Sequence, residues 1–89
     1  MGYNFNASTM TDEDAIRVVR DIMIRHYGGL GVVDAKIFVV WKCKTIQNVK
    51  FIVGTNYDNV IYELTFNGDE NELYVDHYEK INKDIIKLN

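Results

Sequence analysis

The feature of this sequence that most constrains the fold is a change of hydrophobic period near Ala35. Before it, apolar residues recur at spacings of three and four, which is typical of an amphipathic helix. After it, they recur at every second position, which is typical of half-buried strands. The 89 residues leave room for one domain with one core. A helix followed by several strands therefore predicts a small α+β domain.

The helix is expected to begin at Thr11 and to end before Gly28. Thr11 is a good N-cap, and Asp14 lies at the spacing of a capping box. Glycine readily adopts the left-handed conformation that ends a helix. The apolar stripe of the helix consists of Ala15, Ile16, Val19, Ile22, Met23 and Tyr27. We expect residues 1–10 to be a flexible arm and residues 11–89 to be the domain.

The second half of the chain predicts four antiparallel strands joined by short turns. Three breaks of hairpin length interrupt the alternation. The predicted strands are residues 36–43, 49–54, 60–66 and 73–79. This order indicates an up-and-down meander sheet with the helix packed on one face. For residues 81–89 we favour a fifth strand over a single helical turn.

The alternation also predicts which side chains share a face of the sheet. We expect Cys43 opposite Val49 and Trp41 opposite Phe51, because directly opposed residues on antiparallel strands point to one side. The face built in this way is almost wholly apolar and should lie beneath the helix. We call the opposite side of the sheet the outer face.

The outer face is expected to be less polar than a solvated sheet face should be. It combines a row containing lysines with an apolar band at its centre. The predicted partner-binding residues are Phe38, Val40, Lys42, Lys50, Ile52, Ile61, Tyr74 and Tyr78. Two parts of this chain could cover them, namely the arm through Tyr3 and Phe5 or residues 81–89. A second subunit or another protein could also do so.

No constellation in the sequence predicts catalysis, a metal site or a cofactor. Cys43 is the only cysteine, and its predicted inward position favours a role in the core. His26 lies at the helix end and His77 at an inward strand position, and neither has a partner at zinc-ligand spacing. We therefore expect a protein that is not an enzyme.

Two charged clusters have ordinary structural explanations. The acidic cluster comprises Asp69, Glu70, Glu72 and Asp76, and the basic cluster comprises Lys42, Lys44 and Lys50. The first could hold a cation or mimic phosphates, but it lacks the ligand pattern of an EF-hand, so we favour a solvated hairpin tip. The second could bind an anion, but Glu63 is expected beside Lys50, so we favour a salt-bridged surface.

Composition limits the functional class of the protein and the cellular compartment in which it is expected. The net charge of −3 argues against a general nucleic-acid binder, which normally has a basic footprint. A single cysteine excludes an intrachain disulfide. The first residues lack the features of a signal peptide, and no apolar run approaches the roughly 20 residues that cross a bilayer. We expect a cytoplasmic protein.

Two stretches of the sequence are distinctive. The first is residues 39–48, which contain the run Trp-Lys-Cys-Lys-Thr-Ile-Gln-Asn, and the second is residues 62–69, which continues to position 78. On these stretches the chain resembles a family of short uncharacterised proteins encoded by phages and prophages of Gram-positive bacteria. The resemblance covers about residues 37–80. It implies a phage-derived accessory protein in the bacterial cytoplasm, and it carries over no activity and no site residues.

These observations favour a non-enzymatic protein-binding module that acts through the outer face, such as a host-directed inhibitor or an accessory factor. A homodimer formed through the same face is a related alternative, because exposed apolar patches commonly mark interfaces. An alternative from another class is single-stranded nucleic-acid binding, in which lysines and aromatic side chains on the sheet form a stacking platform.

Overall fold

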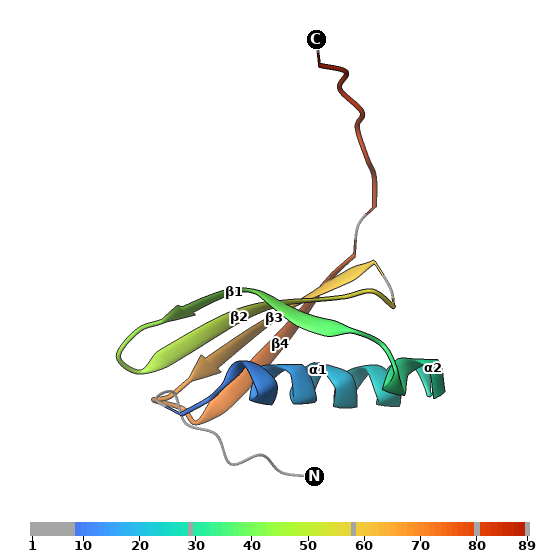
Figure 1. Cartoon of the computed structure of the whole chain (residues 1–89). Helices are drawn as coiled ribbons and strands as arrows, with labels where there is room; N and C mark the ends of the chain where they lie inside the picture. The colour runs from blue at the N-terminus through green and yellow to red at the C-terminus, as the bar shows by residue number, and fades with distance from the viewer. Residues whose placement is uncertain (1–8, 29, 58, 80, 89) are drawn as a thin grey trace.

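The computed structural model describes residues 9–28, 30–57, 59–79 and 81–88. The elements are α1 (Asp12–Tyr27), α2 (Leu30–Val33), β1 (Ile37–Lys44), β2 (Asn48–Thr55), β3 (Val60–Asn67) and β4 (Glu72–Glu79). Helix α1 lies on one face of a four-stranded antiparallel sheet, with the short helix α2 next to its end, so the fold is α+β in two layers (Figure 1). The sheet order β1-β2-β3-β4 confirms the predicted meander. Each strand begins and ends within one residue of its prediction.

Both ends of α1 are confirmed. The backbone N–H of Asp14 donates to Oγ1 of Thr11 at 3.1 Å, and the N–H of Thr11 donates to Oδ2 of Asp14 at 2.9 Å. This capping box satisfies backbone groups that the first turn of a helix leaves unpaired. At the other end Gly28 has φ 67°, and its N–H donates to the carbonyl oxygen of Ile24 at 2.8 Å.

The short helix α2 was not predicted, and Arg20 of α1 holds it in place. Nη1 of Arg20 donates to the carbonyl oxygens of Val32 at 3.1 Å, Val33 at 2.7 Å and Ala35 at 3.1 Å. A guanidinium is well suited to this role because it carries several fixed donors. The contact joins residues 12 to 15 positions apart, so it has no local signature in the sequence.

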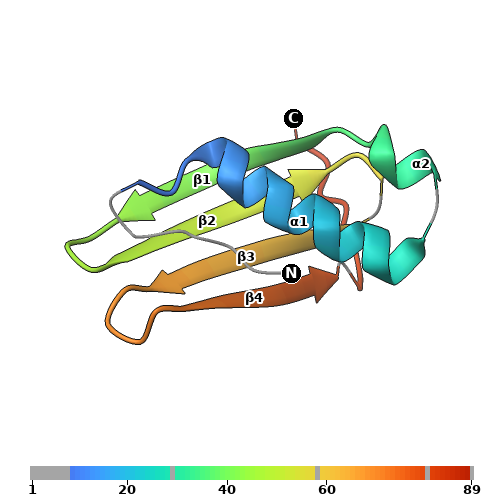
Figure 2. The ribbon, with the colours of Figure 1, turned by 90° about the horizontal axis from the view of Figure 1, so that it is seen from below.

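The core lies between α1 and the inner face of the sheet (Figure 2). Its buried members are Met10, Ala15, Val18, Val19, Met23, Val32, Ala35, Ile37, Val49, Phe51, Val53, Tyr62, Leu64 and Phe66. Met10 is 4% exposed, so it belongs to the core although the sequence analysis placed it in the arm. The remainder of the predicted arm, up to residue 8, lies outside the described residues.

A β-bulge at Val40 makes the predicted register of β1 wrong in its second half. Trp41 pairs with Ile52 and Cys43 pairs with Lys50, each one residue away from the predicted partner. One extra residue in a strand turns every later side chain to the opposite face of the sheet.

The bulge exchanges the positions of two predicted residues. Cys43 is exposed on the outer face, so its predicted place in the core is wrong. Lys42 pairs with Phe51 on the helix side, so its predicted place on the outer face is wrong as well. Nζ of Lys42 lies 5.3 Å from the centre of the Phe51 ring and 3.6 Å from Oδ1 of Asp12 at the start of α1.

Residues 81–88, which we call the C-terminal segment, continue from the end of the sheet without helix or strand. The fifth strand that we favoured from the sequence is therefore wrong for these residues. All eight residues are exposed. The segment rises on the side of the sheet that faces away from α1, which is the side of the outer face (Figure 1).

Candidate interaction face

Three rows of cross-strand neighbours build the outer face. The first contains the pairs Phe38–Gly54 and Ile61–Tyr78, the second runs Trp41–Ile52–Glu63–Asp76, and the third runs Cys43–Lys50–Thr65–Tyr74. In the middle row the half on β1 and β2 is apolar, whereas the half on β3 and β4 carries two carboxylates. In this row the face is therefore apolar over β1 and β2 and acidic over β3 and β4, which we call the acidic side.

The apolar side chains of this face form what we call the apolar band. Its members are Phe38, Val40, Trp41, Ile52, Ile61 and Tyr78. Ile52 is half-buried, and the other five are between 47% and 61% exposed. The face of an antiparallel sheet that meets only water normally carries polar side chains. This one exposes large apolar groups instead.

One hollow of the face lies over the start of β1. It measures about 270 Å³, and Phe38, Val40, Gly54 and Ile61 contribute to its lining. The ring of Phe38 lies against Gly54, where a Cβ would stand 2.9 Å from Cε2 of the ring. Glycine at this position therefore creates the space that the ring occupies.

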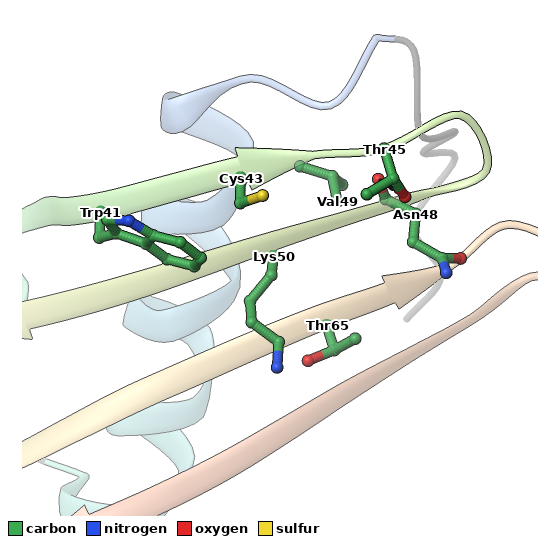
Figure 3. A pocket seen from close by; sticks show the side chains of 7 residues that line it. All are labelled: Trp41, Cys43, Thr45, Asn48, Val49, Lys50 and Thr65. Atoms are coloured by element: carbon green, nitrogen blue, oxygen red, sulfur yellow. Dashed lines mark hydrogen bonds between the residues drawn. The ribbon is translucent and has the colours of Figure 1, made fainter.

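A second hollow, of about 300 Å³, lies further along the same strands. Figure 3 shows the side chains of Trp41, Cys43, Lys50 and Thr65 on the near side of the sheet, with α1 behind it. The thiol of Cys43 and the ammonium of Lys50 flank an indole surface here.

One cation, on β2, lies beside the acidic side of the face. Nζ of Lys50 lies 3.7 Å from Oε2 of Glu63. Glu63 also pairs across the strands with Asp76, and like charges placed directly opposite are destabilising. Within the described residues Asp76 forms no ion pair, so this half of the face keeps an excess of negative charge.

Carboxylates next to two tyrosines raise the pKa of each phenol. The hydroxyl of Tyr78 donates to Oε1 of Glu63 at 3.3 Å, and the charge of Glu63, followed by burial and by Asp76, raises the pKa of Tyr78. The hydroxyl of Tyr74 donates to Oε1 of Glu72 at 2.7 Å, and that hydrogen bond is the main cause that raises the pKa of Tyr74. Both phenols are therefore held in the neutral form.

The two histidines lie together on the other side of the sheet. His26 and His77 line one open hollow of about 370 Å³ with Ile22 and Arg25. The sequence analysis considered them separately, because a contact between a helix end and the last strand has no local signature. The described residues contain no group of three or more histidine, cysteine, aspartate or glutamate side chains that could hold a metal ion.

The structure brings together seven of the eight predicted partner-binding residues on the outer face, and Lys42 is the exception. Their role in binding stays a prediction. Trp41 and Cys43 join the face although the sequence analysis placed them in the core. A sequence signal for a bulge would have revealed both positions. Val39, Val40 and Trp41 are all good strand residues, so the sequence gives no such signal.

Comparison with known proteins returns one family. A model described as a family of unknown function (DUF6275) matches residues 13–88, from the first turn of α1 to the end of the C-terminal segment. No curated protein and no solved structure matches the chain. Among the residues that the structure describes, no helix has the length and the hydropathy to span a bilayer.

Proposed function

This chain belongs to the DUF6275 family of unknown function, and we propose that it is a non-enzymatic protein-binding module that acts through the outer face of its sheet. One observation carries the proposal: the apolar band is exposed on the face that α1 does not cover. Contiguous apolar surface of this kind usually marks a contact with another molecule.

The chemistry of the band suits protein binding. Burying a large apolar side chain completely contributes roughly 1.5–3 kcal/mol. Tryptophan and tyrosine are enriched among the residues that dominate binding energy, and Trp41 and Tyr78 lie at opposite sides of the band. The side chains stand on paired strands, which hold a binding surface more rigidly than loops do.

We extend the proposal to the biological setting through the resemblance of residues 37–80 to short phage and prophage proteins. In this setting the chain is an accessory factor or a host-directed inhibitor that acts in the bacterial cytoplasm. Its partner is a host protein or a second copy of the chain.

Affinity capture with matched variants tests the proposal. The tagged chain is incubated with bacterial lysate, and captured proteins are identified by mass spectrometry. Val40→Asp and Ile61→Asp place a charge in the band and are expected to abolish specific capture. Val33→Asp in α2 is the control, because Val33 is 53% exposed away from this face. Capture that survives both band substitutions in folded protein would contradict the proposal.

Single-stranded nucleic-acid binding is the alternative function, and the position of Trp41 beside Lys50 supports it. Against it stand Glu63 and Asp76, which would repel phosphates from the same face. A titration with fluorescent oligonucleotides at about 50 mM salt decides between the two, because phosphate contacts are strong at low salt. Binding that weakens steeply with added salt would favour this alternative.

A further inference from the structure

The C-terminal segment is the second unpartnered apolar element of this chain. Its large apolar residues are Ile81, Ile85, Ile86 and Leu88, and they are between 76% and 95% exposed. Because side chains of an extended backbone alternate between two sides, Ile81 and Ile85 lie on the same side as Lys83 and Lys87. The family match continues through residue 88, so the segment belongs to the family's domain.

The chemistry of the segment complements that of the outer face. The face offers the apolar band and the carboxylates of Glu63 and Asp76, and the segment offers aliphatic side chains, two lysines and one carboxylate, that of Asp84. A lysine placed near Glu63 and Asp76 would relieve the repulsion between these cross-strand carboxylates. The raised pKa of Tyr78 shows the same excess of negative charge.

The dimensions of the segment also suit the face. Eight extended residues span about 26 Å, at roughly 3.3 Å for each residue. Four neighbouring strands span about 15 Å, at roughly 4.8 Å for each gap. One segment is therefore long enough to cross the whole sheet and to contact both halves of the face.

The direction of the segment decides whose face it covers. It extends away from its own sheet on the outer side, and all of its residues are exposed (Figure 1). A return to its own face would need a reversal of the chain. A second molecule whose outer face is turned toward the first would meet the segment directly, and two-fold symmetry would make the contact mutual.

We propose that the chain forms a homodimer in which the outer faces are turned toward each other and each C-terminal segment lies across the apolar band of the other copy. This inference rests on the proposed function, because it names the occupant of the same face. It assigns Ile81 and Ile85, which share one side of the extended segment, to contacts with the band. It assigns Lys83 and Lys87 to contacts with Glu63 and Asp76.

Light scattering and sedimentation over a range of concentrations test the dimer. The wild-type chain is expected to be a dimer, and the double substitution Ile81→Asp/Ile85→Asp is expected to raise the dissociation constant about 100-fold or more. These side chains are exposed in the single copy, so the substitution leaves the fold intact. The control is Ile46→Asp in the β1–β2 turn, where the isoleucine is 92% exposed.

A mixing experiment tests the exchange. Val40→Asp/Ile61→Asp damages the face and keeps the segment, whereas Ile81→Asp/Ile85→Asp damages the segment and keeps the face. Each variant alone is expected to be monomeric. Their mixture is expected to form a heterodimer through the one intact contact. A segment variant that dimerises like the wild-type chain would overturn the exchange.

The outcomes separate this inference from the proposed function. A wild-type chain that stays monomeric at about 1 mM, the weak limit of specific association, would overturn the dimer. If that monomer still captures a lysate protein and loses it with Val40→Asp alone, the proposed function survives and the inference does not. If neither self-association nor capture depends on Val40, both are wrong.

Discussion

The ring of Phe38 lies over Gly54 on the outer face, and a Cβ on Gly54 would stand 2.9 Å from Cε2 and 3.2 Å from Cζ of that ring. The two residues are direct cross-strand partners at the edge of the sheet. Glycine weakens a strand by roughly 0.5–1 kcal/mol relative to alanine, so its presence here is explained by the space that the ring needs.

We expect Gly54→Ala to displace the Phe38 ring with little effect on stability. The ring is the far end of a side chain that is 48% exposed, so it can swing outward. The gain from alanine offsets the lost contact, and the free energy of unfolding should change by less than about 1 kcal/mol. Nuclear Overhauser contacts of the ring and urea unfolding measure the two effects. An unmoved ring would contradict this explanation.

Gly68→Ala makes the matched comparison, because here the new Cβ would overlap the backbone carbonyl oxygen of Gln47. The N–H of Gly68 donates to that oxygen at 2.9 Å and ties the β3–β4 turn to the β1–β2 turn. A backbone atom cannot swing away, so we expect a loss of about 1–3 kcal/mol in the free energy of unfolding. Equal stabilities of the two alanine variants in urea would show that the turns move freely.

Much of the fold could be predicted from local patterns. The helix ends depend on Thr11, Asp14 and Gly28, which act on residues near them in the sequence. The strands could be predicted from the alternation of apolar and polar residues, and their order from the short turns between them. The bulge at Val40 could not be predicted in this way, because Val39, Val40 and Trp41 all suit a regular strand.

The same limit applies to the candidate face. Phe38, Ile52 and Ile61 were placed on it correctly, because β2, β3 and the start of β1 follow the simple alternation. Trp41 and Lys42 follow the bulge and were exchanged. Bulk and charge alone do not reveal such an exchange, since the lysine stem packs over Phe51 much as an apolar residue would.

The exposure of Trp41 and Cys43 gives a direct test of the bulge. Each is the only residue of its type, so the signals are unambiguous. We expect acrylamide to quench the fluorescence of Trp41 in the folded chain, and we expect the Cys43 thiol to react with a maleimide without denaturant. Both responses should decrease when the outer face is covered. A slow reaction and weak quenching in folded monomer would favour the regular strand over the bulged one.

Two lysines at neighbouring positions of the sheet should behave differently. Lys42→Met removes an exposed ion pair with Asp12, which contributes at most about 1 kcal/mol to stability. Because Lys42 lies on the helix side of the sheet, self-association through the outer face should not change. Lys50→Met leaves Glu63 without its cation on the outer face. The freed carboxylate should attract a lysine of the second copy, and the dissociation constant should fall up to about fivefold at low salt. Sedimentation of both variants at low and high salt measures the difference, and equal effects would refute the assignment of the faces.

The titration of Tyr78 tests the electrostatics of the face. Glu63 opposes formation of the phenolate, which raises the pKa of Tyr78 above its ordinary value. Glu63→Gln removes the charge, so the pKa should fall toward that value. Carbon-13 NMR of labelled tyrosines resolves the residue, and Tyr74 is an internal control because its pKa is raised mainly by Glu72. In a dimer, a nearby lysine should also lower the pKa of Tyr78 as the concentration rises. A Tyr78 pKa that is unchanged by Glu63→Gln would mean that Glu63 does not govern this half of the face.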